Sequence, residues 1–142
     1  MKEAAMLGVH TNILMRCFVD QELWPPDNPR QWAAARKLLN DKSQTLFVNS
    51  IVLAECLWLL ERKLKQPPDG IVRILKGLLE AINVALQDRK AVQDAVTTHV
   101  RSRPGVNDRL IGFLNLNAGC EATLTFDVIA ARTKGFRLLL AE

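Results

Sequence analysis

Three acidic residues and one histidine are placed along the chain where they could form a cation-binding centre. Glu55 is the only charged residue between positions 43 and 60, inside an apolar run that we expect to be buried. An ionised carboxylate buried without a partner is very costly, so Glu55 should be paired, neutralised or bound to a cation. The other candidates are His10, Asp108 and Asp127. Carboxylate oxygens suit Mg²⁺ or Mn²⁺, and such ions activate water for phosphodiester hydrolysis.

Hydrophobic periodicity and turn residues predict the elements that must position these side chains. Short apolar runs predict strands at residues 6–9, 45–48, 82–86, 122–126 and 136–140. Helical spacing predicts helices at residues 12–19, 29–39, 51–63, 68–79, 89–100, 107–117 and 127–132. We expect Asn49 or Ser50 to cap the 51–63 helix, Asp88 to cap the 89–100 helix, and Gly119 to end the 107–117 helix.

This alternation of strands and helices predicts an α/β fold with a mostly parallel sheet covered on both faces. In such sheets, ligands bind beyond the carboxyl ends of the strands. His10 follows the first predicted strand and Asp127 follows the fourth, whereas Glu55 and Asp108 lie near the starts of two helices. If the sheet closes in this order, the four side chains converge.

Each acid also has a purely structural interpretation. Glu55 could form an ion pair with an arginine such as Arg16 or Arg109. Asp108 could interact with a helix dipole, and Asp127 could cap a helix N-terminus. The case for a metal site therefore depends on the combination of positions.

Length and composition are those of an ordinary globular protein. The chain has 142 residues, of which 49% are hydrophobic and 24% are charged, so we expect a single domain over residues 1–142. No apolar run could span a bilayer and the first residues lack a signal-peptide pattern, which favours a cytoplasmic protein. We expect Cys17, Cys56 and Cys120 to be reduced core thiols. The net charge of +4 is compatible with RNA or an acidic protein as partner.

The order of four segments resembles the PIN-domain family, and most closely the VapC-type ribonuclease toxins of toxin–antitoxin modules. The similar segments are residues 8–14, 49–60, 107–111 and 118–127. The most specific part is the segment ending in Thr125-Phe126-Asp127, and the resemblance extends from Met6 to about Leu139.

The resemblance implies a three-layer α/β/α sandwich with a central parallel sheet. It also implies Mg²⁺- or Mn²⁺-dependent endonuclease cleavage of RNA, inhibition by a small antitoxin protein, and a homodimer. Glu55, Asp108 and Asp127 match three acidic positions of the family, and Asn12 and Thr125 match polar residues that flank the site.

The chain departs from the family pattern at the first acid, where His10 replaces the expected aspartate. A further acid is absent where Gly105 stands. Neutral imidazole is a poor Mg²⁺ ligand but is acceptable for Mn²⁺, so the resemblance implies a weakened nuclease or a PIN domain that acts only by binding. His10 could instead be a hydrogen-bonded core histidine. Arg16, Arg109 and Arg132 are candidates for contacts with phosphate.

Overall fold

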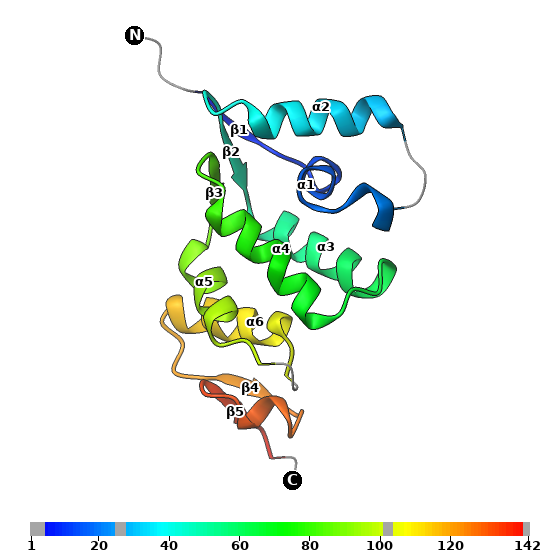
Figure 1. The fold of residues 1–142 in the computed structure, drawn as a ribbon. Coiled ribbons are helices and arrows are strands. Elements are labelled where there is room, and N and C mark those ends of the chain that lie inside the picture. Colours follow the sequence, from blue (N-terminus) through cyan, green and yellow to red (C-terminus); the bar gives the residue numbers. More distant parts are fainter. Residues whose placement is uncertain (1–4, 25–27, 101–103, 141–142) are drawn as a thin grey trace. The chain divides into compact units, whose positions relative to one another are not determined.

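A computed structural model describes residues 5–24, 28–100 and 104–140. By its internal contacts the chain divides into two compact units, residues 1–87 and 88–142, and each unit is described by itself. Both units combine helices with parallel strands (Figure 1). The α/β class predicted from the sequence is therefore confirmed.

The first unit is built on a three-stranded parallel sheet. Its strands are β1 (Met6–Gly8), β2 (Thr45–Val48) and β3 (Val84–Leu86), in the order β1-β2-β3. Leu46 of β2 lies opposite Leu7 on one side and Val84 on the other. Leu46 and Val48 are both 1% exposed, as expected for apolar side chains in a central strand.

Helices supply the rest of the first unit. They are α1 (Thr11–Phe18), η1 (Gln21–Leu23), α2 (Pro29–Asn40), α3 (Ser50–Trp58), η2 (Leu59–Lys63) and α4 (Pro68–Glu80). Figure 1 shows α2 in cyan beside α1 in blue, and the two helices are in contact. Trp32 and Ala35 form the buried face of α2.

Local side-chain chemistry sets two helix starts in this unit. Asn28 accepts a hydrogen bond from the Arg30 amide at 2.9 Å, directly before Pro29 begins α2. Asn49 accepts one from the Val52 amide at 2.8 Å, so Asn49 is the cap of α3. The single helix expected over residues 51–63 ends in a wider π-helical turn, in which the Leu64 amide bonds to the Leu59 carbonyl.

The second unit contains two longer helices and a two-stranded parallel sheet. The elements are α5 (Arg89–Thr97), α6 (Val106–Asn117), β4 (Thr123–Thr125), η3 (Ala130–Arg132) and β5 (Phe136–Leu138). β4 pairs with β5, with Thr123 opposite Phe136. Asp88 occupies the N-cap position of α5 but makes no side-chain capping bond, so the predicted cap is wrong.

Two glycines shape the second unit. Gly119 has φ +100° and follows the end of α6, which confirms it as the terminator of that helix. Gly112 lies buried within α6 against β5, and a Cβ atom built on it would stand 2.6 Å from the Phe136 ring. The absence of a side chain at Gly112 therefore allows α6 to pack closely on Phe136.

Candidate active site

Glu55 lies on the exposed side of α3, and the prediction that its apolar run is buried on every side is wrong. The helix buries Val52, Leu53, Cys56, Leu57. It exposes Ile51 (72%), Trp58 (60%), Ala54 and Glu55. These four exposed positions share one side because residues three and four apart are neighbours on a helix. The apolar residues around Glu55 therefore gave no indication in the sequence that one side of α3 is exposed. Glu55 lies on that exposed side.

The position of the Glu55 carboxylate is set by Thr11 at the start of α1. The Thr11 hydroxyl donates a 3.0 Å hydrogen bond to Oε2 of Glu55. Thr11 is 4% exposed, so the donor of this part-buried bond is shielded from water although the acceptor belongs to an exposed residue. Among the described residues of the first unit, Glu55 makes no ion pair, so the proposed pairing with Arg16 is not found there.

Thr11 is a site residue that sequence reasoning missed. It lies between His10 and Asn12, which were both candidates for the site. A threonine at the start of a helix, however, is usually interpreted as a structural residue. Its role becomes evident only from the fold, which brings Thr11 next to Glu55, 44 residues away in the sequence.

Burial and the neighbouring Glu55 carboxylate both disfavour ionisation of the Cys56 thiol. Desolvation, followed by the negative charge of Glu55, raises the pKa of Cys56 to about 12. Burial also raises the pKa of the Cys17 thiol. Both cysteines are buried free thiols, as predicted, whereas Cys120 is exposed and does not belong to a core. Burial therefore disfavours the thiolate form of both cysteines.

His10 is exposed, so the core-histidine interpretation is wrong. It holds the N-cap position of α1 in an extended conformation and makes no side-chain capping bond. Asn12 is also exposed, and its carbonyl accepts a 2.7 Å bond from Nη1 of Arg16. The Arg16 guanidinium lies 5.9 Å from the Trp24 ring and 6.0 Å from the Trp32 ring, a cation–π arrangement within the first unit.

Asp127 follows β4 and organises the turn into η3. Its Oδ1 accepts hydrogen bonds from the amides of Ile129 at 2.8 Å and Ala130 at 3.3 Å, in the turn that leads into η3, whose N-cap position is Ile129. Its own amide donates to the Thr125 hydroxyl at 3.0 Å. Thr125 thus orients the backbone of Asp127 and not its carboxylate. Within the described chain, Oδ2 of Asp127 makes no hydrogen bond, so one oxygen of an oriented carboxylate remains accessible.

Asp108 is half-buried in the first turn of α6. This position is favourable for an acid because the helix dipole is positive there. The side chain forms no hydrogen bond or ion pair with the residues that the structure describes. Both of its oxygens are therefore available as ligands.

The candidate ligands are divided between the two units. His10 and Glu55 lie in the first unit, and Asp108 and Asp127 lie in the second. Over residues 5–24, 28–100 and 104–140, no group of three or more His, Cys, Asp or Glu side chains is gathered to hold a metal ion. The convergence of the four side chains therefore stays a prediction. The chemistry of the donors fits a hard cation, because each acid keeps at least one oxygen that forms no hydrogen bond with the described residues.

Comparisons with known proteins place the chain in a family. The PIN domain model matches residues 11–135, which include Glu55, Asp108 and Asp127 and extend over both units. A comparison with curated proteins finds no match. No helix in the described part of the chain is long and apolar enough to cross a membrane. Because the match covers most of its length, the chain belongs to the PIN-domain family, whose members are usually nucleases.

Proposed function

We propose that this protein is a metal-dependent endoribonuclease in which Glu55, Asp108 and Asp127 hold a divalent cation. The observation that carries the proposal is that all three carboxylates lie inside the matched PIN segment and each keeps an oxygen free of hydrogen bonds to the residues that the structure describes. We further propose that residues 1–142 form one PIN domain, because the match extends across both units.

Each residue would have a distinct role. A bound Mg²⁺ or Mn²⁺ supplies activation of water and neutralisation of charge on the phosphodiester. Glu55 would present Oε1, because Thr11 already holds Oε2. Asp127 would present Oδ2 in an orientation fixed by the two amide bonds to Oδ1. Asp108 would add the third charge from the first turn of α6.

His10 is the feature that weakens this centre. The resemblance places an aspartate at this position, and His10 stands one residue before the matched segment begins. Loss of one negative charge lowers the attraction for a divalent cation, and imidazole favours Mn²⁺ over Mg²⁺. We expect reduced activity, and the same observation favours a second candidate function, in which a degenerate PIN domain binds antitoxin or RNA without cleavage.

The biological setting follows from the resemblance to VapC-type toxins. We propose a toxin that acts on RNA in the cytoplasm, is inhibited by a small antitoxin protein, and forms a homodimer. The sequence contains 19 Lys and Arg against 15 Asp and Glu, a balance that supports a polyanionic substrate.

A paired metal titration tests the proposed function. Mn²⁺ and Mg²⁺ are titrated by calorimetry into the protein and its His10→Asp variant, and cleavage of structured RNA is followed in parallel. We expect the aspartate variant to bind Mg²⁺ more tightly and to cut faster. Glu80→Gln removes an exposed acid at the end of α4, in the same unit as Glu55, and is the matched control for Glu55→Gln.

Three outcomes separate the candidates. Cleavage by the unmodified chain, with loss in Glu55→Gln but not in Glu80→Gln, supports a working site. Cleavage only after His10→Asp supports the degenerate binding protein. If the His10→Asp variant binds no divalent cation and cuts no RNA, the proposed centre is wrong.

A further inference from the structure

The second unit contains a pocket of about 550 Å³ that the proposed centre does not use. One wall is a single side of α6, formed by Arg109, Phe113 and Leu116. These positions are spaced four and three residues apart and therefore lie along one helix face. The opposite wall comes from the segment after β4, and the lining there is Ile129, Arg132, Thr133 and Lys134. Thr98 and Pro104 complete it.

Among the lining residues that the structure describes, three carry a positive charge and none is acidic. Arg109, Arg132 and Lys134 contribute to the pocket wall, and none of their side chains forms a hydrogen bond or ion pair with the described residues. Nε of Arg109 is buried and lacks a hydrogen-bond partner in the described part of the chain. A buried donor on a cation is costly unless an acceptor reaches it. The pocket therefore has the chemistry of an anion site.

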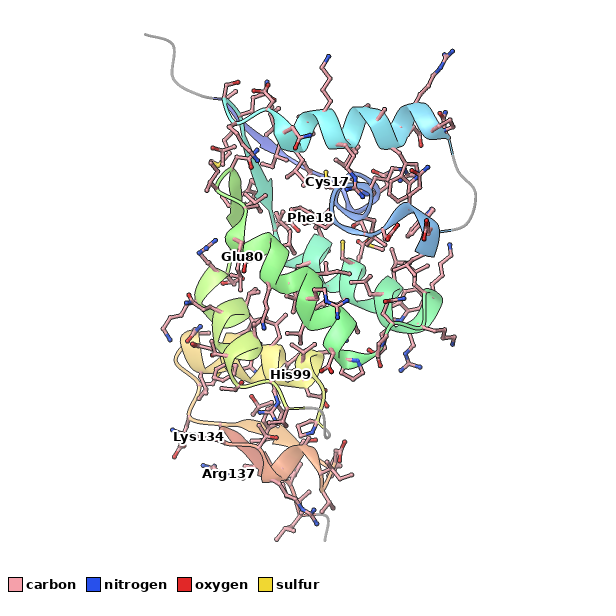
Figure 2. The ribbon with its side chains drawn as sticks, viewed as in Figure 1. Cys17, Phe18, Glu80, His99, Lys134 and Arg137 are labelled. Atoms are coloured by element: carbon pink, nitrogen blue, oxygen red, sulfur yellow. The ribbon has the colours of Figure 1, made fainter. Side chains whose placement is uncertain are left out.

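Two other cationic side chains of the same unit form ion pairs. Lys90 pairs with Asp94 at 3.1 Å, and Arg137 pairs with Glu121 at 3.6 Å. Figure 2 labels Lys134, which belongs to the pocket wall, and Arg137 of β5, which belongs to an ion pair. Within the described part of the chain, the three pocket cations thus have no acidic partner, whereas Lys90 and Arg137 each have one.

The remaining lining is apolar or carries hydroxyl groups. Phe113, Leu116 and Ile129 offer an aromatic face and aliphatic contacts. The Thr98 hydroxyl donates to the Asp94 carbonyl at 2.7 Å and can therefore only accept from a ligand. The volume lies within the range of small-molecule sites, which is roughly 300–1,000 Å³. A ligand that joins an anionic group to a flat ring matches this lining better than an inorganic anion does.

We propose that this pocket binds one nucleotide of an RNA strand, with its phosphate held by Arg109, Arg132 and Lys134 and its base against Phe113. The choice of RNA rests on the proposed function, whereas the anion-plus-ring chemistry rests on the pocket alone. Charge-assisted bonds from arginine suit phosphate oxygens, and stacking of bases on aromatic side chains is tolerant of sequence. The site would hold the strand without taking part in the cleavage step.

Binding measurements without divalent ions test the proposal. In EDTA, calorimetry is run with AMP, UMP and inorganic phosphate, and fluorescence anisotropy is run with a labelled single-stranded RNA. The Arg132→Gln/Lys134→Gln double variant should lose at least about tenfold in affinity for AMP and RNA. Phe113→Leu should weaken AMP but leave inorganic phosphate unchanged. The control is Arg137→Gln, which removes a cation outside the pocket and should change affinity less than twofold.

The outcomes distinguish this inference from the proposed function. Asp108→Asn should abolish cleavage and preserve AMP binding, because the two sites use different side chains. Absence of AMP binding to the unmodified protein, or equal loss in Arg137→Gln, would overturn the pocket proposal even if RNA is cut. Equal affinity for AMP and inorganic phosphate would also overturn it, since a nucleotide site requires a contribution from the base. Arg132 and Lys134 are exposed, and circular dichroism checks that the double variant is folded.

Discussion

The hydroxyl of Thr11 donates a 3.0 Å hydrogen bond to Oε2 of Glu55, and it joins the first turn of α1 to the exposed face of α3. The donor is buried and the acceptor belongs to an exposed residue. This arrangement holds one carboxylate oxygen and leaves the other without a hydrogen bond to the described residues. Partners of this kind orient metal ligands, and their loss typically lowers metal affinity by about 10–100-fold.

Thr11→Val should therefore weaken the proposed centre with little effect on the fold. Valine has nearly the same shape but cannot donate, so we expect a loss of about 1 kcal/mol in unfolding free energy. Mn²⁺ affinity should fall by about tenfold, and RNA cleavage should fall with it. Thr11→Ser keeps the hydroxyl and should restore metal affinity. Equal metal binding by Thr11→Val and the unmodified protein would show that the bond has only a structural role.

The pKa of Cys56 predicts a specific alkaline weakness of the fold. The folded thiol has its pKa raised to about 12 from an ordinary value of 9.0. The stability that this thiol contributes is therefore complete below pH 9 and is lost as the pH rises toward 12, because the unfolded chain ionises first. The chain contains no tyrosine, which simplifies this pH range.

Urea unfolding at pH 8 and pH 10 measures this effect. Cys56→Ala should show a smaller decrease in unfolding free energy between the two pH values than the unmodified protein does. Cys120→Ala changes an exposed thiol and should show the unmodified decrease. If the two variants lose stability equally, Cys56 is not the group responsible.

Close packing at Gly112 predicts a large response to a single methyl group. Gly112→Ala should destabilise the protein by about 1–3 kcal/mol, because the new Cβ would lie 2.6 Å from Cε2 of Phe136. Gly77→Ala in α4 is the matched control, since its Cβ would lie 3.6 Å from Phe18. That variant should be neutral or gain up to about 1 kcal/mol from helix propensity. Thermal unfolding is measured for both variants and for the double variant Gly112→Ala/Phe136→Leu. The comparison separates the effect of the clash with Phe136 from the effect of helix propensity.

The local elements of this chain were predictable because their signals are local. Asn49 caps α3 and Gly119 ends α6 through bonds within a few residues, and both were identified from the sequence. The predicted bounds of β2 also agree with the structure, since a short apolar run between polar residues has few alternatives. Asp88 failed as a cap although its residue type is favourable, because its backbone conformation at φ −119°, ψ 56° is not the usual extended one.

The candidate site was less predictable because burial depends on contacts between distant segments. The apolar run around Glu55 has one side packed and one side exposed, and composition alone did not separate them. Thr11 and Glu55 are far apart in sequence, so no spacing pattern relates them. The pocket lined by Arg109 and Lys134 is likewise formed by two separate segments, α6 and the segment after β4. The sequence therefore identified the acidic residues themselves but not the side chains that surround them in the fold.

Asp127 allows its structural and chemical roles to be separated by two substitutions. Asp127→Asn retains an oxygen that can accept from the Ile129 and Ala130 amides, so its unfolding free energy should change by less than about 0.5 kcal/mol. It removes the charge needed for the cation, so Mn²⁺ binding and RNA cleavage should be lost. Asp127→Ala removes both functions and should also cost about 1 kcal/mol of stability. Metal titration and urea unfolding of the two variants distinguish the roles. Full Mn²⁺ affinity in Asp127→Asn would mean that Asp127 only stabilises this turn, and the proposed centre would then lose one of its three acids.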